Sequence, residues 1–278
     1  MSNRINQKSR LFFLGINIFI LIQILGLLTG WRMWNLPEWR EAFKVPHYSL
    51  GEFLISFLAA LLFILIFLKI FKKRYFPFRL LFYFLVFLTG SIVFLVWLPE
   101  VLAISLVIVL FLILHFRSNI LIQNVAVVLM CIGAACFLGL GFEPKQLIVI
   151  LIVLAIYDII AVFISGHMIK MFKEMVSHRL VLALTIPATS KGWLTNLSQV
   201  QAGKDFMFLG SGDLVLPLAL AISSLRQGFL ASIFVILGAF LGMTILARYF
   251  LWQKERRPLP ALPPIITGAI FGYLISLI

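Results

Sequence analysis

Residues 147–166 read LIVILIVLAIYDIIAVFISG, twenty residues among which Asp158 is the one charged side chain. An α-helix rises about 1.5 Å per residue, so twenty apolar residues cross roughly 30 Å, the thickness of the hydrocarbon core of a bilayer. We therefore predict a transmembrane helix over this stretch. An acidic group inside such a helix is costly, and by default it indicates a functional position.

The rest of the chain has the same character. Hydrophobic residues make up 63% of its 278 residues and charged residues 12%, about half the share found in soluble proteins. Eight further apolar runs are long enough to span a membrane: residues 11–30, 51–71, 80–97, 98–116, 121–141, 206–225, 228–250 and 259–278. We expect an all-α polytopic membrane protein with nine transmembrane helices, forming a single membrane-embedded domain over residues 1–278. The first run is longer than the apolar region of a signal peptide and lacks its cleavage site, so we interpret it as a retained span.

Two connections between these runs are distinctive. The third and fourth runs are separated only by Leu98-Pro99-Glu100, which predicts a tight reversal. The connection over residues 167–205 is the longest, and its Leu180–Ile186 stretch is rich in Leu, Val and Ile. We expect this stretch to form a short strand or a re-entrant segment.

The basic residues indicate an orientation. When the nine runs are threaded through a bilayer, 18 of the 23 Lys and Arg residues fall on the side of the N-terminus. The positive-inside rule then predicts a cytoplasmic N-terminus and a C-terminus outside. The net charge of +13 is explained by this asymmetry. We expect contacts with membrane lipid, including anionic lipid, and no nucleic-acid partner.

Eight of the ten acidic residues lie in loops or at the ends of runs, and the other two, Asp158 and Asp213, lie inside apolar runs. Asp158 stands about 12 Å before the inner end of its run and Asp213 about 10 Å beyond the inner end of the next, so their depths match. If the two helices touch, the carboxyl groups would share one proton and activate water as in an aspartic protease. The acids alone leave two alternatives open: interhelical hydrogen bonding, and a proton or cation relay in a transporter or channel.

Two motifs accompany the acids. Asp213 ends Gly210-Ser211-Gly212-Asp213, in which the glycines allow close approach of another backbone. Four prolines between residues 258 and 264 make a regular first helical turn at the start of the ninth run unfavourable. The glycine pairs 26/30, 238/242 and 268/272 predict close helix packing. No metal-ligand spacing is present, and neither a metal nor another cofactor is expected.

The chain resembles the presenilin and signal peptide peptidase family of intramembrane aspartyl proteases, most closely the compact microbial presenilin homologues. Three motifs, in the order and at the depths typical of the family, carry this resemblance: Tyr157-Asp158, Gly210-Ser211-Gly212-Asp213 and Pro260-Ala261-Leu262. The resemblance implies that Asp158 and Asp213 are the catalytic pair. It also implies that Tyr157, Gly210, Ser211 and Gly212, with Pro260, Ala261 and Leu262, shape the site and bind the substrate.

The resemblance further implies cleavage of single-span transmembrane helices in a microbial cell membrane. The predicted orientation matches the presenilin branch, whose substrates have their N-terminus outside. The 167–205 connection lacks the long loop that animal presenilins cleave in themselves, so accessory subunits are not expected to be required. Prepilin peptidases share Gly-x-Gly-Asp but not Pro-Ala-Leu, and we rank that alternative low.

Overall fold

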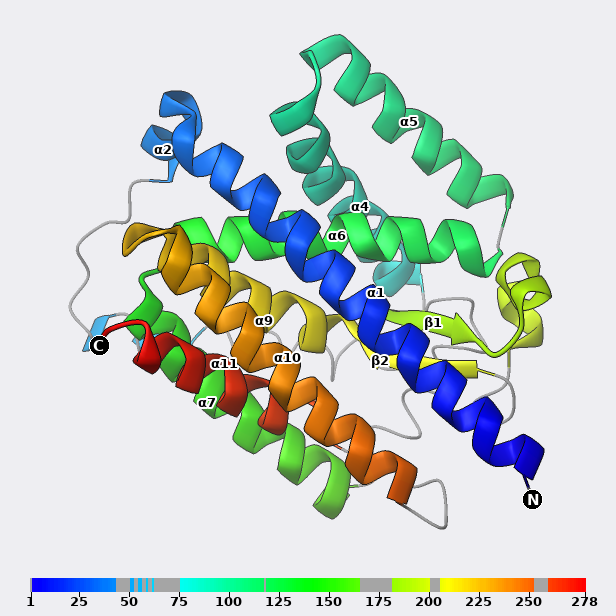
Figure 1. Ribbon diagram of the computed structural model, residues 1–278. Coiled ribbons are helices and arrows are strands. Elements are labelled where there is room, and N and C mark those ends of the chain that lie inside the picture. The colour runs from blue at the N-terminus through cyan, green and yellow to red at the C-terminus, as the bar shows by residue number, and fades with distance from the viewer. Residues whose placement is uncertain are drawn as a thin grey trace.

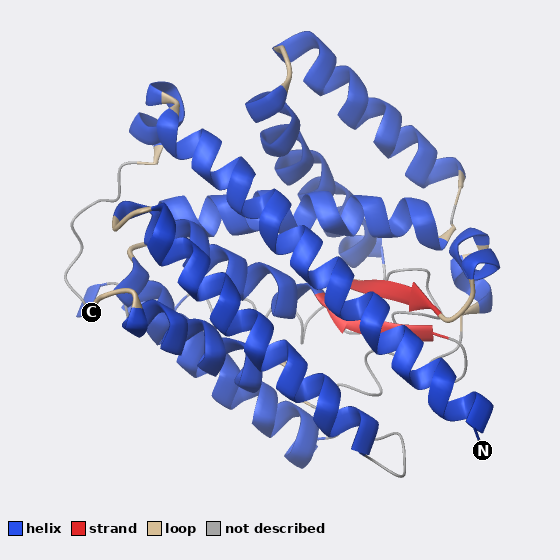
Figure 2. Ribbon diagram, in the orientation of Figure 1, coloured by secondary structure: helices blue, strands red, loops and turns tan. Residues whose placement is uncertain are grey.

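The computed structural model describes residues 2–43, 51–52, 55–56, 59, 62, 76–117, 119–165, 182–200, 206–252 and 260–278. Nine α-helices and one two-stranded sheet are formed within these residues (Figures 1 and 2). The helices are α1 (Ser2–Asn35), α2 (Pro37–Ala42), α4 (Phe76–Trp97), α5 (Glu100–Phe116), α6 (Ile120–Gly141), α7 (Pro144–Ile160), α9 (Ser211–Ser223), α10 (Phe229–Trp252) and α11 (Leu262–Ile275).

Five helical segments in the described part of the chain are long and apolar enough to cross a membrane: Arg10–Asn35, Leu80–Trp97, Ile120–Gly141, Pro144–Phe163 and Phe229–Trp252. Helices α5 and α11 are apolar but shorter. The tight reversal predicted at residues 98–100 is confirmed, because α4 ends at Trp97 and α5 begins at Glu100. The predicted span over residues 51–71 lies almost wholly outside the described residues.

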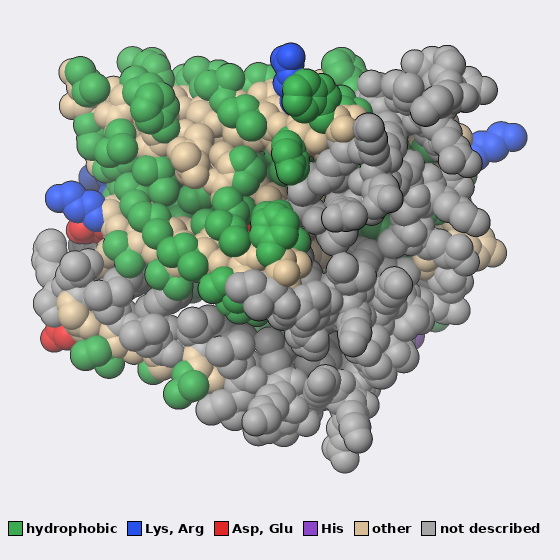
Figure 3. Space-filling model, turned by 90° about the horizontal axis from the view of Figure 1, so that it is seen from below, with side chains coloured by type: hydrophobic (Ala, Val, Ile, Leu, Met, Phe, Trp, Pro, Cys, Tyr) green, Lys and Arg blue, Asp and Glu red, His purple; other side chains and the backbone are tan. Residues whose placement is uncertain are grey.

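The surface of this bundle is apolar. Leucine, isoleucine, valine and phenylalanine side chains along α5 are exposed, with Val101 at 80% and Phe116 at 78% of full exposure. In Figure 3, hydrophobic side chains dominate the described part of the face shown, and charged groups lie near its margins. An apolar surface of this extent is stable against lipid and not against water, so it fits a polytopic membrane protein.

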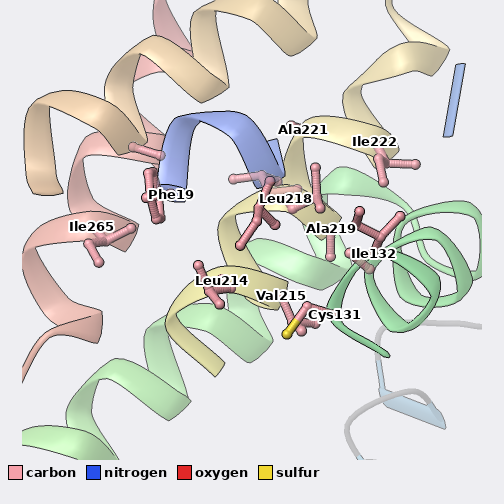
Figure 4. Close-up of a cluster of buried hydrophobic side chains, with 14 of the residues drawn as sticks. Phe19, Cys131, Ile132, Leu214, Val215, Leu218, Ala219, Ala221, Ile222 and Ile265 are labelled. Carbon is pink, nitrogen blue, oxygen red and sulfur yellow. The ribbon is translucent and has the colours of Figure 1, made fainter. Parts of the chain in front are cut away.

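Helix α9 forms the centre of the bundle. It contacts α1, α6, α7, α10 and α11, and its side chains from Leu218 to Ile222 are fully buried. Figure 4 shows Leu214, Leu218 and Ile222 of α9 among core side chains contributed by the neighbouring helices. A helix packed against five others can hold a functional group at a fixed position.

The predicted close packing at the glycine pairs is confirmed. A Cβ atom at Gly30 would lie 2.7 Å from the Ile222 side chain, and one at Gly26 would overlap Leu218. Likewise, a Cβ at Gly238 would overlap the backbone of Gly268. Glycine therefore lets α1 approach α9 and lets α10 approach α11.

The sheet is an antiparallel hairpin of β1 (Ala183–Pro187) and β2 (Phe206–Gly210), paired from Ala183↔Gly210 to Pro187↔Phe206. The strand predicted within Leu180–Ile186 is thus confirmed. The prediction of a helix beginning at residue 206 was wrong, because residues 206–210 form β2 and α9 begins only at Ser211. The aromatic run Phe206-Met207-Phe208 suits a strand, and pairing with β1 satisfies its backbone locally.

The irregular start predicted for the ninth run is confirmed. Residues 260 and 261 are not helical, and α11 begins at Leu262, three residues after the predicted boundary at 259. Pro260 cannot donate a backbone hydrogen bond, which favours an irregular segment before the helix. Residues 253–259 lie outside the described residues.

Candidate active site

Asp158 lies at the point where α7 changes its helical form. The α-helix ends at Ile160 and continues as a π-helical segment, Ala161–Ser165. The N–H of Ala161 bonds to the backbone carbonyls of both Tyr157 and Asp158. The turns of a π-helical segment are wider than those of an α-helix. Such segments occur often at functional sites, because they redirect side chains that a regular helix would hold elsewhere.

The Pro-Ala-Leu segment meets Asp158 directly. The backbone N–H of Leu262 donates to Oδ2 of Asp158 at 3.2 Å. Leu262 is the first residue of α11, where backbone N–H groups lack helical acceptors, and Pro263 and Pro264 carry no N–H at all. The Asp158 carboxylate therefore accepts a hydrogen bond at the start of α11. This bond links the sixth predicted run, which carries Asp158, to the ninth.

Asp213 is held by its own motif. It is the third residue of α9, and Gly210 is the N-cap. Its carboxylate accepts a hydrogen bond from the Gly210 backbone N–H, which is half of a capping box. A Cβ atom at Gly210 would lie 3.0 Å from Oδ2 of Asp213, so glycine leaves room for this contact.

The two acids lie close enough to interact electrostatically, and α7, α9 and α11 contact one another. Residues that are far apart in the sequence thus converge on one place. Two carboxyl groups so arranged repel each other when both are ionised and can share a proton around a water molecule. The helices that carry the two acids contact each other, as the matched depth of the acids along the chain predicted.

The other predicted site residues vary in exposure. Ser211 is half-buried, and its N–H bonds to the Leu182 carbonyl at 3.3 Å. Gly212 is exposed, and a Cβ there would meet open space. Tyr157 is 57% exposed, so its ring is not packed into the core beside Asp158. Pro260 and Ala261 are half-buried, and Leu262 is buried.

Gln23 of α1 is a supporting residue that sequence reasoning missed. It is fully buried, and its Nε2 donates to the carbonyl of Leu214, the residue after Asp213, at 3.0 Å. The same turn of α9 is weakened at Pro217, which has no N–H for the carbonyl of Asp213. A glutamine inside the apolar run 11–30 is the sequence signal that indicates such a contact.

The comparisons with known proteins agree with this geometry. The family model described as "Signal-peptide peptidase, presenilin aspartyl protease" matches residues 16–278. Two solved structures of a presenilin family intramembrane aspartate protease, in the C222 and P2 space groups, are similar to the chain, with TM-scores of 0.60 and 0.64. Their sequence identities are 21% and 22%, and each alignment covers 95% of this chain and 96% of the other. These structures establish likeness of fold. No curated protein matches the chain significantly.

Proposed function

The chain belongs to the signal-peptide peptidase, presenilin aspartyl protease family, and from that premise we propose that Asp158 and Asp213 are the catalytic pair of this intramembrane aspartyl protease. The observation that carries the proposal is the contact of Leu262 with Asp158, whose carboxyl interacts in turn with that of Asp213. Three motifs from separate segments thereby form one site.

The proposed chemistry needs the two carboxyl groups in different protonation states, one ionised and one protonated. The ionised one takes a proton from water, and the resulting hydroxide attacks the scissile carbonyl. The protonated one donates to the carbonyl oxygen as it becomes negative, and a proton then passes to the departing amide nitrogen. Because the acids titrate as a pair, we assign these states to the pair and not to either residue.

The neighbouring residues are proposed to receive the substrate. The open space beside Gly212 would admit a substrate backbone next to Asp213. The irregular segment at Pro260 and Ala261 would border the same place, because Leu262 contacts Asp158. Ser211 would hold the start of α9 against the hairpin through Leu182, and Tyr157 would contact substrate or lipid at the edge of the site.

The proposed substrates are single-span transmembrane helices. A helix hides its peptide groups in internal hydrogen bonds, so it must unwind before water can attack. We propose that the unwound stretch becomes extended and pairs with the β1–β2 hairpin or with the segment at Pro260. The hairpin runs directly into α9, so a strand bound there would lie next to Asp213.

The distribution of Lys and Arg supports nine spans in one membrane-embedded domain, with a cytoplasmic N-terminus. Substrates would then have their N-terminus outside. The proposed setting is the cell membrane of a microbe, with no accessory subunits required.

The test uses the purified full chain in lipid with a single-span helical substrate, and the fragments are mapped by mass spectrometry. Wild-type protein should cut within the transmembrane stretch. Asp158→Asn and Asp213→Asn should each abolish cleavage while eluting and melting like the wild type. Near-normal fragment yield from either variant would remove that residue from the chemistry.

A further inference from the structure

The side chain of Asn124 in α6 bonds to the backbone of β1. Its Nδ2 donates to the carbonyl of Thr185 at 2.7 Å, and its Oδ1 accepts from the N–H of Thr185 at 2.9 Å. Both residues are buried, with Asn124 at 5% and Thr185 at 0% exposure. The amide of Asn124 therefore satisfies both backbone groups of Thr185, as a neighbouring strand would.

This contact lies on the edge of β1 that faces away from β2. In an antiparallel pair, alternate residues direct both backbone groups toward the partner strand. The Leu182 carbonyl accepts from Ser211, so the even-numbered residues of β1 face β2 and Thr185 faces the opposite edge. Asn124 closes that edge at Thr185, and Pro187 offers no N–H there. A third strand would therefore run along β2.

The hairpin is coupled to the catalytic pair through continuous backbone. β2 ends at Gly210, and α9 carries Asp213 three residues later. A shift of one residue in strand pairing moves the chain by about 3.3 Å and turns each side chain to the other face. The position of the hairpin, held by β1 on one side and continued into α9 on the other, would set which peptide bond of a strand paired with β2 lies opposite the carboxyl groups.

We propose that Asn124 is a positioning residue that selects the scissile bond: it fixes β1 against α6, and the paired hairpin passes this register to the substrate strand. The inference rests on the proposed function, because it assumes a substrate that pairs with the hairpin beside Asp213. A purely structural role would change the amount of folded protein but not the position of the cut.

The test compares Asn124→Leu, which removes both hydrogen bonds at similar volume, with Asn124→Asp, which keeps an acceptor for the Thr185 N–H. The control is Leu140→Ala, also on α6, which loses core packing far from the hairpin. Fragments of one single-span substrate are mapped for all four proteins. Asn124→Leu loses both hydrogen bonds, so the share cut at neighbouring bonds should rise about 30-fold in Asn124→Leu and less in Asn124→Asp. Leu140→Ala should cut where the wild type cuts.

Hydrogen exchange of the Thr185 amide measures the contact itself, independently of cleavage. It should be faster in Asn124→Leu than in Leu140→Ala when the two are compared at equal overall stability. Unchanged fragment positions in Asn124→Leu, or unchanged exchange at Thr185, would overturn the proposal. So would complete loss of cleavage in both Asn124 variants, because the contact would then decide whether the substrate is cut and not where. Cleavage by Asp213→Asn would instead overturn the proposed function, whatever the Asn124 variants do.

Discussion

The two acids differ in how the chain holds them. Asp213 is bonded by Gly210, three residues before it, within the first turn of the central helix α9. Asp158 is bonded by Leu262, 104 residues away, at the half-buried end of α7. The position of Asp213 is thus set by local backbone, whereas that of Asp158 depends on the packing of α7 against α11. Substitutions beside Asp213 should therefore lower kcat with little change in stability, whereas substitutions beside Asp158 should lower both kcat and stability.

The largest effect is expected from a probe that requires both acids. A peptide with a hydroxyl group in place of the scissile carbonyl mimics the transition state and lies between the carboxyl groups. Its affinity should fall about 10³-fold in either Asp→Asn variant, because each carboxyl contributes a contact that the substrate ground state lacks. A matched peptide without the hydroxyl should bind all three proteins equally. Unchanged affinity for the hydroxyl peptide in one variant would assign the chemistry to the other acid alone.

The local contact at Asp213 can be broken by one methyl group. Gly210→Ala places a Cβ 3.0 Å from Oδ2 of Asp213, so the carboxylate must shift. The carboxylate must give by a few tenths of an ångström, so we expect kcat to fall about 10- to 30-fold with little change in stability. Gly212→Ala is the control, because its Cβ meets open space. Steady-state kinetics should show a kcat effect at 210 and at most a KM effect at 212; equal kcat losses would refute the local account.

The remote contact at Asp158 can be loosened from α11. Leu262→Ala removes a buried side chain at the first residue of the helix, so the N–H that bonds Asp158 is held less firmly. We expect kcat to fall about tenfold together with a stability loss of about 2–4 kcal/mol. Ile266→Ala, one turn further along α11 and equally buried, should lose similar stability and keep its kcat. Parallel losses of kcat would mean that the Asp158 contact has no special role.

The smallest effect is expected at Gln23, which supports the turn after Asp213. Gln23→Leu removes the bond to the Leu214 carbonyl but also removes Oε1, a buried oxygen that has no partner among the described residues. These changes offset each other, so stability should change by about 1 kcal/mol or less while kcat falls about threefold. Asn17→Leu is the control on the same helix, because the side chain of Asn17 donates to the carbonyl of Phe13 in its own helix. A kcat loss in Asn17→Leu equal to that in Gln23→Leu would argue against the contact.

Much of this architecture follows from apolar runs and isolated polar residues. Run length predicted the five helices in the described part of the chain that are long and apolar enough to cross a membrane, and two acids at one depth predicted that their helices meet. The relay interpretation left open by the acids alone is resolved by membership in the aspartyl protease family. Pro99 predicted the reversal between α4 and α5, and the structure contains it. The glycine pairs predicted close helix packing, which is also present.

Features that depend on tertiary contacts were not predictable. The run at residues 206–225 opens with Phe206-Met207-Phe208-Leu209, and a short apolar stretch of this kind has no periodicity that separates strand from helix. Its first five residues become a strand because β1, from another segment, lies beside them. Asn124 and Gln23 are polar residues in otherwise apolar stretches of helix, so the sequence shows that they need partners but not which backbone groups supply them.

The most direct test of the central claim is the rate at which a single-span substrate is cut by Asp158→Asn, Asp213→Asn and the double variant in the same lipid. If the carboxyl groups act as one unit, each single variant should be as slow as the double variant, about 10³-fold or more below the wild type. A single variant that cuts within about tenfold of the wild-type rate would contradict the assignment of Asp158 and Asp213 as the catalytic pair.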